Sequence, residues 1–217
     1  MQRTTEKYNK RDFWIQENQK YAEPHFRLTK AARLINKIAG DSECDLLDVG
    51  CGPATLMQAV RPNVNYYGID IAIHHAAPNL REFDFIEKPI AFDNKQFDII
   101  IAQGVFEYIG SSQSRKFSEI ARLLRADGRF IASYVNFGHR DVQIYAPYNN
   151  VRTLDEFTNG VSQYFEINEL LPTSHHWHHH EPNRAYMKTL QMHINVNIPI
   201  LSRFLAVEYF FICCARK

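Results

Sequence analysis

The stretch Leu46–Ala54 limits the possible folds of this 217-residue chain more than any other, because an apolar run there changes abruptly into glycines. It reads Leu-Leu-Asp-Val-Gly-Cys-Gly-Pro-Ala, and a helical pattern follows over Pro53–Val60. A strand that ends in a glycine-rich turn and passes into a helix presents its end to a nucleotide. Gly50 and Gly52 suit that turn, because glycine adopts positive φ and lets a ligand approach the backbone.

Two acids near the turn indicate what kind of nucleotide derivative binds. Thr55 stands where the dinucleotide fingerprint has its third glycine, so that match is partial. Asp48 would repel a pyrophosphate and attract a cation, such as the sulfonium and ammonium of S-adenosylmethionine. Asp70 ends the next expected strand, where an acid can accept both ribose hydroxyls of an adenosine. Alternatively, both acids are ordinary polar residues at strand ends.

Further segments complete an ordered set between residues 44 and 135. They are Asp48–Ala54, Gly68–Asp70, Phe97–Val105 and Leu123–Phe130. Through this set the chain resembles the class I S-adenosylmethionine-dependent methyltransferases, although many members have a third glycine at the position of Ala54. The resemblance implies an α/β, Rossmann-like fold: a seven-stranded, mostly parallel sheet flanked by helices, with the last strand antiparallel. It also implies methyl transfer from S-adenosyl-L-methionine, with S-adenosyl-L-homocysteine as the product.

The cofactor site that we expect combines these residues with others that match the family's motifs. The resemblance places Asp84 and Phe85 at the adenine; alternatively, Asp84 caps a helix and Phe85 belongs to the core. The resemblance also places the Gln103–Ile109 loop against cofactor and acceptor. The guanidinium of Arg27 can pair with the methionyl carboxylate, or it can be a surface group in a helical pattern. The predicted cofactor-binding residues are Arg27, Asp48, Gly50, Cys51, Gly52, Asp70, Ile71, Asp84, Phe85, Gln103 and Gly104.

The acceptor side is less clearly defined. Many relatives have Glu-His where this chain has Glu107-Tyr108, so Tyr108 is a candidate for orienting an acceptor hydroxyl. His139, which leaves the expected sheet on the ligand side, and His178 are the candidate general bases. Either histidine can instead be a loop residue without a catalytic task.

Five of the ten histidines lie in the segment His175–His180. Three interpretations stay open: a metal site, an acceptor pocket in which His178 or His176 is the base, and an exposed loop. Nearly contiguous imidazoles rarely converge on one metal, so no metal ligand is predicted.

The alternation of strand-like and helical patterns predicts one domain over residues 1–217. We expect a helical cap over 1–40, a cofactor-binding core over 44–135 and an insertion over 172–206 on the acceptor side. The aromatic residues of the cap either form a lid over the cofactor or only seal the sheet edge. The expected strands are Asp45–Val49, Asn65–Ile69, Leu80–Asp84, Phe97–Ala102, Arg129–Val135, Tyr164–Leu171 and Val207–Ala215. The expected helices are Asp12–Tyr21, Phe26–Ala39, Pro53–Val60, Ser111–Leu124, Thr153–Asn159 and the first half of Arg184–Asn197, with a weaker connection over Ala72–Ala77.

Charge and composition point to a small-molecule acceptor. The formal net charge is +1, so no general field attracts nucleic acid or an anionic membrane. No Asn-Pro-Pro-Tyr, a motif linked to methylation of nucleobase amines, follows the fourth expected strand. No apolar run approaches the roughly 18 residues of a membrane span, the first residues form no signal peptide, and the four cysteines fit reduced thiols, so we expect a cytoplasmic protein.

Other functions remain open on the sequence alone. The segment Arg184–Asn197 either closes the acceptor pocket or forms a homodimer interface. An NAD-dependent oxidoreductase would use the same acid at Asp70, but Asp48 and Thr55 disfavour it. A non-catalytic module that binds S-adenosylmethionine as a regulatory or partner subunit is the alternative of another class.

Overall fold

The structure is a computed structural model that describes residues 11–23, 25–90, 92, 95–136, 153–176, 191–192 and 198–216. The helices are α2 (Arg11–Asn18), η1 (Gln19–Tyr21), α3 (Phe26–Ala39), η2 (Thr55–Gln58), η3 (Gly110–Ser112), α4 (Gln113–Leu123), α6 (Leu154–Ser162) and α7 (Pro199–Leu205). The strands are β1 (Cys44–Val49), β2 (Val64–Asp70), β3 (Leu80–Glu82), β4 (Phe97–Ala102), β5 (Leu124–Val135), β6 (Phe165–His176), β7 (Gln191–Met192) and β8 (Ala206–Ala215).

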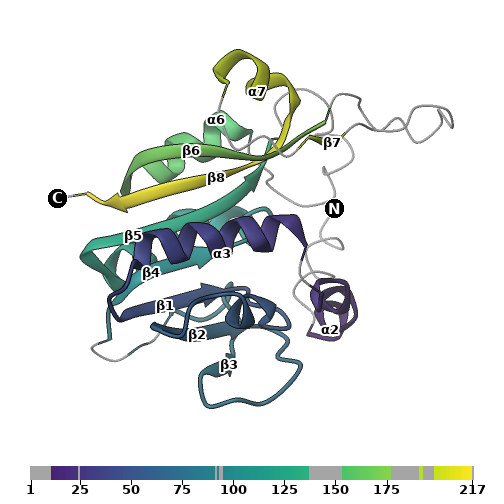
Figure 1. Ribbon diagram of the computed structural model, residues 1–217, viewed down its shortest axis with the longest axis vertical. Coiled ribbons are helices and arrows are strands. Elements are labelled where there is room, and N and C mark those ends of the chain that lie inside the picture. The colour runs from purple at the N-terminus through teal and green to yellow at the C-terminus, as the bar shows by residue number, and fades with distance from the viewer. Residues whose placement is uncertain are drawn as a thin grey trace, which may run out of the picture.

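These strands form one sheet in the order β3-β2-β1-β4-β5-β8-β6-β7 (Figure 1). The pairs among β1 to β5 are parallel, and β8 runs antiparallel between β5 and β6. The predicted fold class is therefore confirmed. The two-residue strand β7, which pairs with the end of β6, adds one strand to the seven expected.

Alternate residues of the strands build a core on each face of the sheet. One core joins α3, through Leu28 and Ile35, to β1 and β4, through Leu46 and Ile99. The other core joins α4 and α6 to the neighbouring positions of the same strands, and it is dense in phenylalanine rings. In Figure 1, α3 crosses one face of the sheet, while α2 stands at the edge where the parallel strands end.

Several expected boundaries are correct, and the clearest case is the start of α6. Thr153 Oγ1 accepts a hydrogen bond from the Glu156 backbone N–H at 3.2 Å, while the Glu156 carboxylate accepts one from the Thr153 N–H at 2.7 Å. This is the predicted capping box, which satisfies two N–H groups at the start of the helix. The helix predicted over Phe26–Ala39 also has those bounds.

The helix predicted over Pro53–Val60 is wrong, because the structure has only the single 3₁₀ turn η2 there. Ala54 adopts left-handed backbone angles, with φ of 56°, which an α-helix cannot include. Pro62 follows closely, so few residues remain for a longer helix. No helix forms over Ala72–Ala77 either, and β3 ends two residues before the predicted Asp84.

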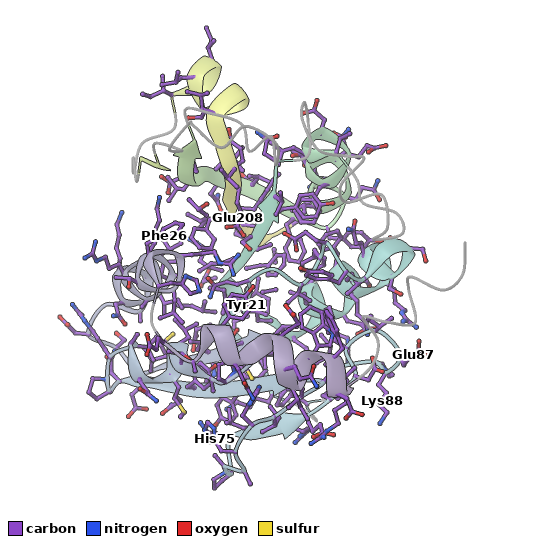
Figure 2. All side chains as sticks on the ribbon, turned by 90° about the vertical axis from the view of Figure 1, so that its right-hand side faces the viewer. Tyr21, Phe26, His75, Glu87, Lys88 and Glu208 are labelled. Carbon is purple, nitrogen blue, oxygen red and sulfur yellow. The ribbon has the colours of Figure 1, made fainter. Side chains whose placement is uncertain are left out.

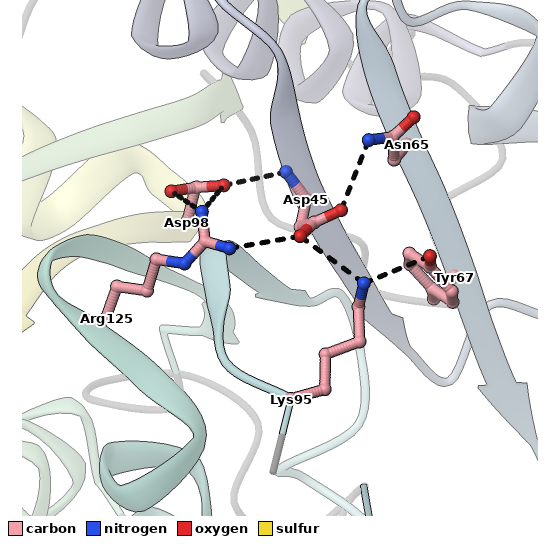
Figure 3. A network of polar contacts seen from close by, with 6 residues as sticks. All are labelled: Asp45, Asn65, Tyr67, Lys95, Asp98 and Arg125. Carbon is pink, nitrogen blue, oxygen red and sulfur yellow. Dashed lines mark hydrogen bonds and ion pairs between the residues drawn. The ribbon is translucent and has the colours of Figure 1, made fainter.

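Ion pairs and hydrogen bonds join the amino ends of the central strands, which are the ends opposite the glycine turn (Figure 3). Arg125 Nη1 contacts both carboxylate oxygens of Asp98 at 2.6 and 2.7 Å, and its Nη2 lies 3.2 Å from Asp45. Asp98 also accepts the Asp45 backbone N–H at 2.8 Å, and Lys95 lies 3.3 Å from the Asp45 carboxylate. This network ties β1, β4 and β5 together at their amino ends.

Candidate active site

A cavity of about 220 Å³ lies at the carboxyl ends of the parallel strands. In an open α/β sheet this edge is where ligands bind. The predicted cofactor residues all line it: Arg27, Asp48, Gly50, Cys51, Gly52, Asp70, Ile71, Asp84, Phe85, Gln103 and Gly104. The structure therefore brings the whole predicted set together around one space.

The glycine turn forms the cavity floor where β1 ends. Gly50 and Gly52 have φ of 72° and 53°, in the left-handed region that favours glycine. The Gly50 N–H donates to the Ile69 carbonyl at 2.8 Å, so β2 holds the turn against the sheet. A Cβ added at Gly50 would lie 2.4 Å from Val105 Cγ2, so the turn has no room for a side chain there.

The two predicted acids are buried beside this turn and are hydrogen-bonded. Asp70 accepts the Gly52 N–H and the Ala72 N–H, both at 2.8 Å, one on each carboxylate oxygen. Asp48 accepts the Tyr66 hydroxyl at 2.6 Å. Burial, followed by the nearby charge of Asp70, raises the pKa of Asp48 to about 7 against the lowering effect of the Tyr66 hydrogen bond. Burial also raises the pKa of Asp70.

The far wall of the cavity is formed by Asp84–Ile86, in the segment that follows β3. One oxygen of Asp84 accepts the backbone N–H groups of Ile86 and Glu87, at 2.9 and 3.1 Å, so this carboxylate caps a turn as well as lining the cavity. Phe85 lines the same cavity and packs edge-on against Phe106. The wall thus offers the carboxylate and the apolar ring that suit an adenine.

Helix α4 holds this wall from behind. Lys116 is fully buried, and its Nζ donates to the Lys88 carbonyl at 2.6 Å and to Glu119 at 2.8 Å. The ammonium also lies 5.0 Å from the centre of the Phe85 ring. Glu119 in turn accepts the Ile90 N–H at 3.0 Å. Lys116 therefore ties α4 to this wall. The sequence did not predict this contact, because a lysine in an amphipathic helix ordinarily faces solvent.

We expect Lys116→Met to lower the free energy of unfolding by about 3 kcal/mol, because it leaves buried partners without their cation. The wall that carries Phe85 should also loosen, so the affinity for S-adenosylhomocysteine should fall by roughly tenfold. Chemical denaturation and calorimetric titration measure the two effects. Lys88→Met is the matched control, because that side chain is exposed and lies at the periphery in Figure 2. Equal behaviour of the two variants would contradict the role given to Lys116.

The loop after β4 is fixed to β5. The Gly104 N–H donates to Ser133 Oγ at 2.9 Å, and Gly104 has φ of 63°. Gln103 beside it lines the cavity, and its Oε1 is buried with no hydrogen-bond partner within the described residues. The loop therefore presents an unused acceptor atom next to the glycine turn.

Arg27 is not the surface group that its helical pattern allowed. Its Nη1 lies 3.0 Å from Glu208 Oε1, and the Glu208 side chain is buried at the start of β8. Burial lowers the pKa of Arg27, but the charges of Glu208 and Glu107 raise it. The net shift of the Arg27 pKa is upward. Figure 2 places Glu208 and Tyr21 near the centre of the molecule, and Tyr21 and Arg27 line the cavity. The sequence signal for Glu208 was an acid inside the apolar run of the last strand.

Glu107, like Glu208, is a residue of the site to which the sequence analysis assigned no role. It lines the cavity, its Oε1 accepts the Val135 N–H at 3.1 Å, and its buried Oε2 has no partner among the described residues. Burial, followed by the charge of Glu208, raises the pKa of Glu107 to about 8. The sequence feature that could have indicated Glu107 is its place in the loop after β4, next to Tyr108.

The expected cap contributes Trp14 and Tyr21 to the lining of the cavity. Trp14 from α2 packs edge-on against Tyr108, with ring centroids 5.0 Å apart, and both line the cavity. Thr55 Oγ1 donates to the Tyr21 carbonyl at 2.8 Å, which fastens the cap to the end of the glycine turn. His139 and His178 lie outside the described residues, as does the side chain of His176, so their predicted roles stay predictions.

The described ranges contain no group of three His, Cys, Asp or Glu side chains placed to hold a metal ion. Among the described helices, none combines the length and apolarity needed to cross a membrane.

Comparisons with known proteins agree with this geometry. A putative methyltransferase from Haloferax volcanii, solved in complex with the Trm112 activator, has a similar fold, with a TM-score of 0.66 and 16% identity over 99% of this chain and 98% of that one. An S-adenosylmethionine-dependent methyltransferase from Clostridium acetobutylicum has a TM-score of 0.61 and 11% identity over 91% of this chain and 94% of that one. The N-methyltransferase NodS from Bradyrhizobium japonicum, in complex with S-adenosyl-L-homocysteine, has a TM-score of 0.56 and 10% identity over 94% of this chain and 99% of that one. A search of curated proteins returned no match.

The family comparison covers most of the chain. A family model described as a methyltransferase domain matches residues 24–189, which include the glycine turn, both acids and the loop after β4. This match decides against the oxidoreductase alternative. The fold, the glycine turn with its acids and the family match together identify the chain as a member of the methyltransferase-domain family, the class I S-adenosylmethionine-dependent methyltransferases.

Proposed function

We propose that this enzyme transfers a methyl group from S-adenosylmethionine to a small-molecule acceptor inside the cavity at the strand ends. The observation that carries the proposal is the convergence of the predicted cofactor residues on one cavity. Its walls are rich in carboxylates and aromatic rings, which suit a ligand with an adenosine at one end and positive charge at the other.

Each wall has a task in this proposal. Asp70 holds the ribose hydroxyls, Asp84 and Phe85 hold the adenine, and Gly50 lets the turn pack against Val105 at the cavity, where a side chain would clash. Asp48 provides negative charge for the cationic part. When bound, the cofactor supplies an electrophilic methyl group on a sulfonium, and the residues of the cavity gain rate by holding the acceptor close to that methyl.

The acceptor subsite lies on the side of Tyr108 and Trp14. These two rings line the cavity next to the loop after β4, and Tyr108 is suited to orient an acceptor. A net charge of +1 gives the chain no general attraction for nucleic acid, which favours a small acceptor over a polymer. For a hydroxyl acceptor, His139 and His178 remain the proposed bases. A homodimer through residues 184–197 also remains part of the proposal.

The test is transfer of labelled methyl from S-adenosylmethionine into a cell extract that has been separated into dialysable, protein and nucleic acid fractions. Label in the dialysable fraction is the expected result, and Asp70→Ala should lower it strongly. Label in the nucleic acid or protein fraction would overturn the small-molecule acceptor. Binding of S-adenosylhomocysteine without transfer to any fraction would support the non-catalytic module instead.

A further inference from the structure

Two buried oxygen atoms at the cavity have no hydrogen-bond partner within the part of the chain that the structure describes. They are Gln103 Oε1 and Glu107 Oε2, and both side chains line the cavity. Gln103 Oε1 accepts hydrogen bonds, as does Glu107 Oε2 when its carboxylate is ionised, and no buried side-chain donor of the described residues is left in the same state. Since unpaired buried acceptors cost free energy, a ligand that completes this site must bring donors.

The charges around Glu107 indicate what kind of donor it needs. Arg27 is shared by two buried carboxylates, because it pairs with Glu208 at 3.0 Å and also interacts electrostatically with Glu107. With both acids ionised and His25 neutral, as the lowering of its pKa by burial and by Arg27 favours, the group lacks one positive charge. The raised pKa of Glu107, which stems from burial and from Glu208, agrees with this, since a retained proton takes the place of the missing cation.

The position of Glu107 separates it from the adenosine end of the cavity. It bonds to Val135 at the end of β5, and Val135 stands opposite Glu208 in the pairing of β5 with β8. Asp70 ends β2, which is separated from β5 by β1 and β4. At the usual spacing of strands, this is roughly 14 Å across the sheet. Glu107 therefore lies far from the adenosine end of the cavity and is next in the chain to Tyr108 of the proposed acceptor subsite.

We propose that the acceptor is an amine that enters as its ammonium, and that Glu107 binds this ammonium and removes its proton. This inference rests on the proposed function and specifies its substrate class. The proton passes from nitrogen to Glu107 Oε2. The freed nitrogen lone pair forms the bond to the methyl carbon, and the sulfur retains the electron pair of the carbon–sulfur bond that breaks. The methylated amine leaves as its ammonium, and Glu107 returns its proton to solvent.

The test compares benzylamine with benzyl alcohol, because the two probes differ only in the ammonium or hydroxyl group and the rings of Trp14 and Tyr108 suit their phenyl group. Both probes are titrated calorimetrically just above the Glu107 pKa of about 8, where its carboxylate is mostly ionised, into protein saturated with S-adenosylhomocysteine. We expect the wild type to bind benzylamine at least about tenfold more tightly than benzyl alcohol, and Glu107→Gln to lose this preference. Glu87→Gln, which removes an exposed acid at the periphery in Figure 2, should retain it.

The affinity for S-adenosylhomocysteine is measured on each variant beforehand. It should remain within about threefold of wild type in Glu107→Gln, because Glu107 serves the acceptor and not the cofactor. A large loss would overturn the inference by placing Glu107 at the methionyl ammonium. Equal binding of the two probes, no binding of benzylamine at millimolar concentration, or a preference retained in Glu107→Gln would also overturn it. Absence of S-adenosylhomocysteine binding in the wild type would instead contradict the proposed function. A thermal melt of each variant distinguishes loss of the site from loss of the fold. Glu208→Gln should also weaken the preference for benzylamine.

Discussion

Asp70→Ala should weaken the binding of S-adenosylhomocysteine about 100-fold, or by about 2.7 kcal/mol. The carboxylate accepts the Gly52 and Ala72 N–H groups and is proposed to accept the ribose hydroxyls as well. Its removal would therefore loosen the glycine turn and deprive the ligand of its strongest acceptor. Calorimetric titration of S-adenosylhomocysteine measures the effect.

Two comparisons sharpen this prediction. Asp70→Asn, which keeps one acceptor oxygen, should lose less affinity than Asp70→Ala. Asp41→Ala removes an exposed acid just before the amino end of β1, at the end of the strand opposite the cavity. This variant should bind like wild type. If Asp70→Ala binds within about twofold of wild type, Asp70 is only a strand-end residue that supports the turn.

The second large effect is a dependence of S-adenosylmethionine affinity on pH. Burial raises the pKa of Asp48 to about 7, and a cationic ligand favours the ionised carboxylate. Below this pKa the carboxyl is neutral and must release its proton when the ligand binds. Affinity should therefore rise about tenfold from pH 6 to pH 8 and become level above the pKa. Titrations in buffers of different ionisation enthalpy should also detect the released proton.

Asp48→Asn separates this effect from the other groups near the cavity. Tyr66, Cys51 and Asp70 face Asp48, and Glu107 lines the same cavity and titrates near pH 8. The variant should bind more weakly at pH 8 and lose most of the slope between pH 6 and pH 8. A slope that persists in Asp48→Asn would assign the dependence to Glu107 instead.

The fold and the site could be predicted from the sequence wherever residues close together in the chain determine the structure. The apolar run, Gly50 and the acids Asp48 and Asp70 lie within one strand–turn–strand unit, so their meeting at one edge follows from parallel pairing of β1 and β2. The helix Phe26–Ala39 could be predicted from its spacing of apolar residues. The helix expected over Pro53–Val60 failed because its pattern ignored the left-handed Ala54.

The parts of the site that the sequence did not reveal depend on contacts between distant residues. Arg27 and Glu208 are 181 positions apart, and no local pattern shows that they pair. Lys116 looked like a solvent residue of an amphipathic helix, although it is buried against Lys88 and Glu119. Glu107 stood inside a recognised motif, but its unpaired oxygen became apparent only after β5 and β8 were placed beside it.

The most direct test of the central claim, that this cavity holds S-adenosylmethionine, is calorimetric titration of the wild-type protein with S-adenosylhomocysteine and, separately, with NAD. We predict micromolar binding of S-adenosylhomocysteine at one site per chain and no binding of NAD. Binding of NAD with equal or greater affinity, or binding of neither ligand, would contradict the account of the site given by Asp48, Gly50 and Asp70.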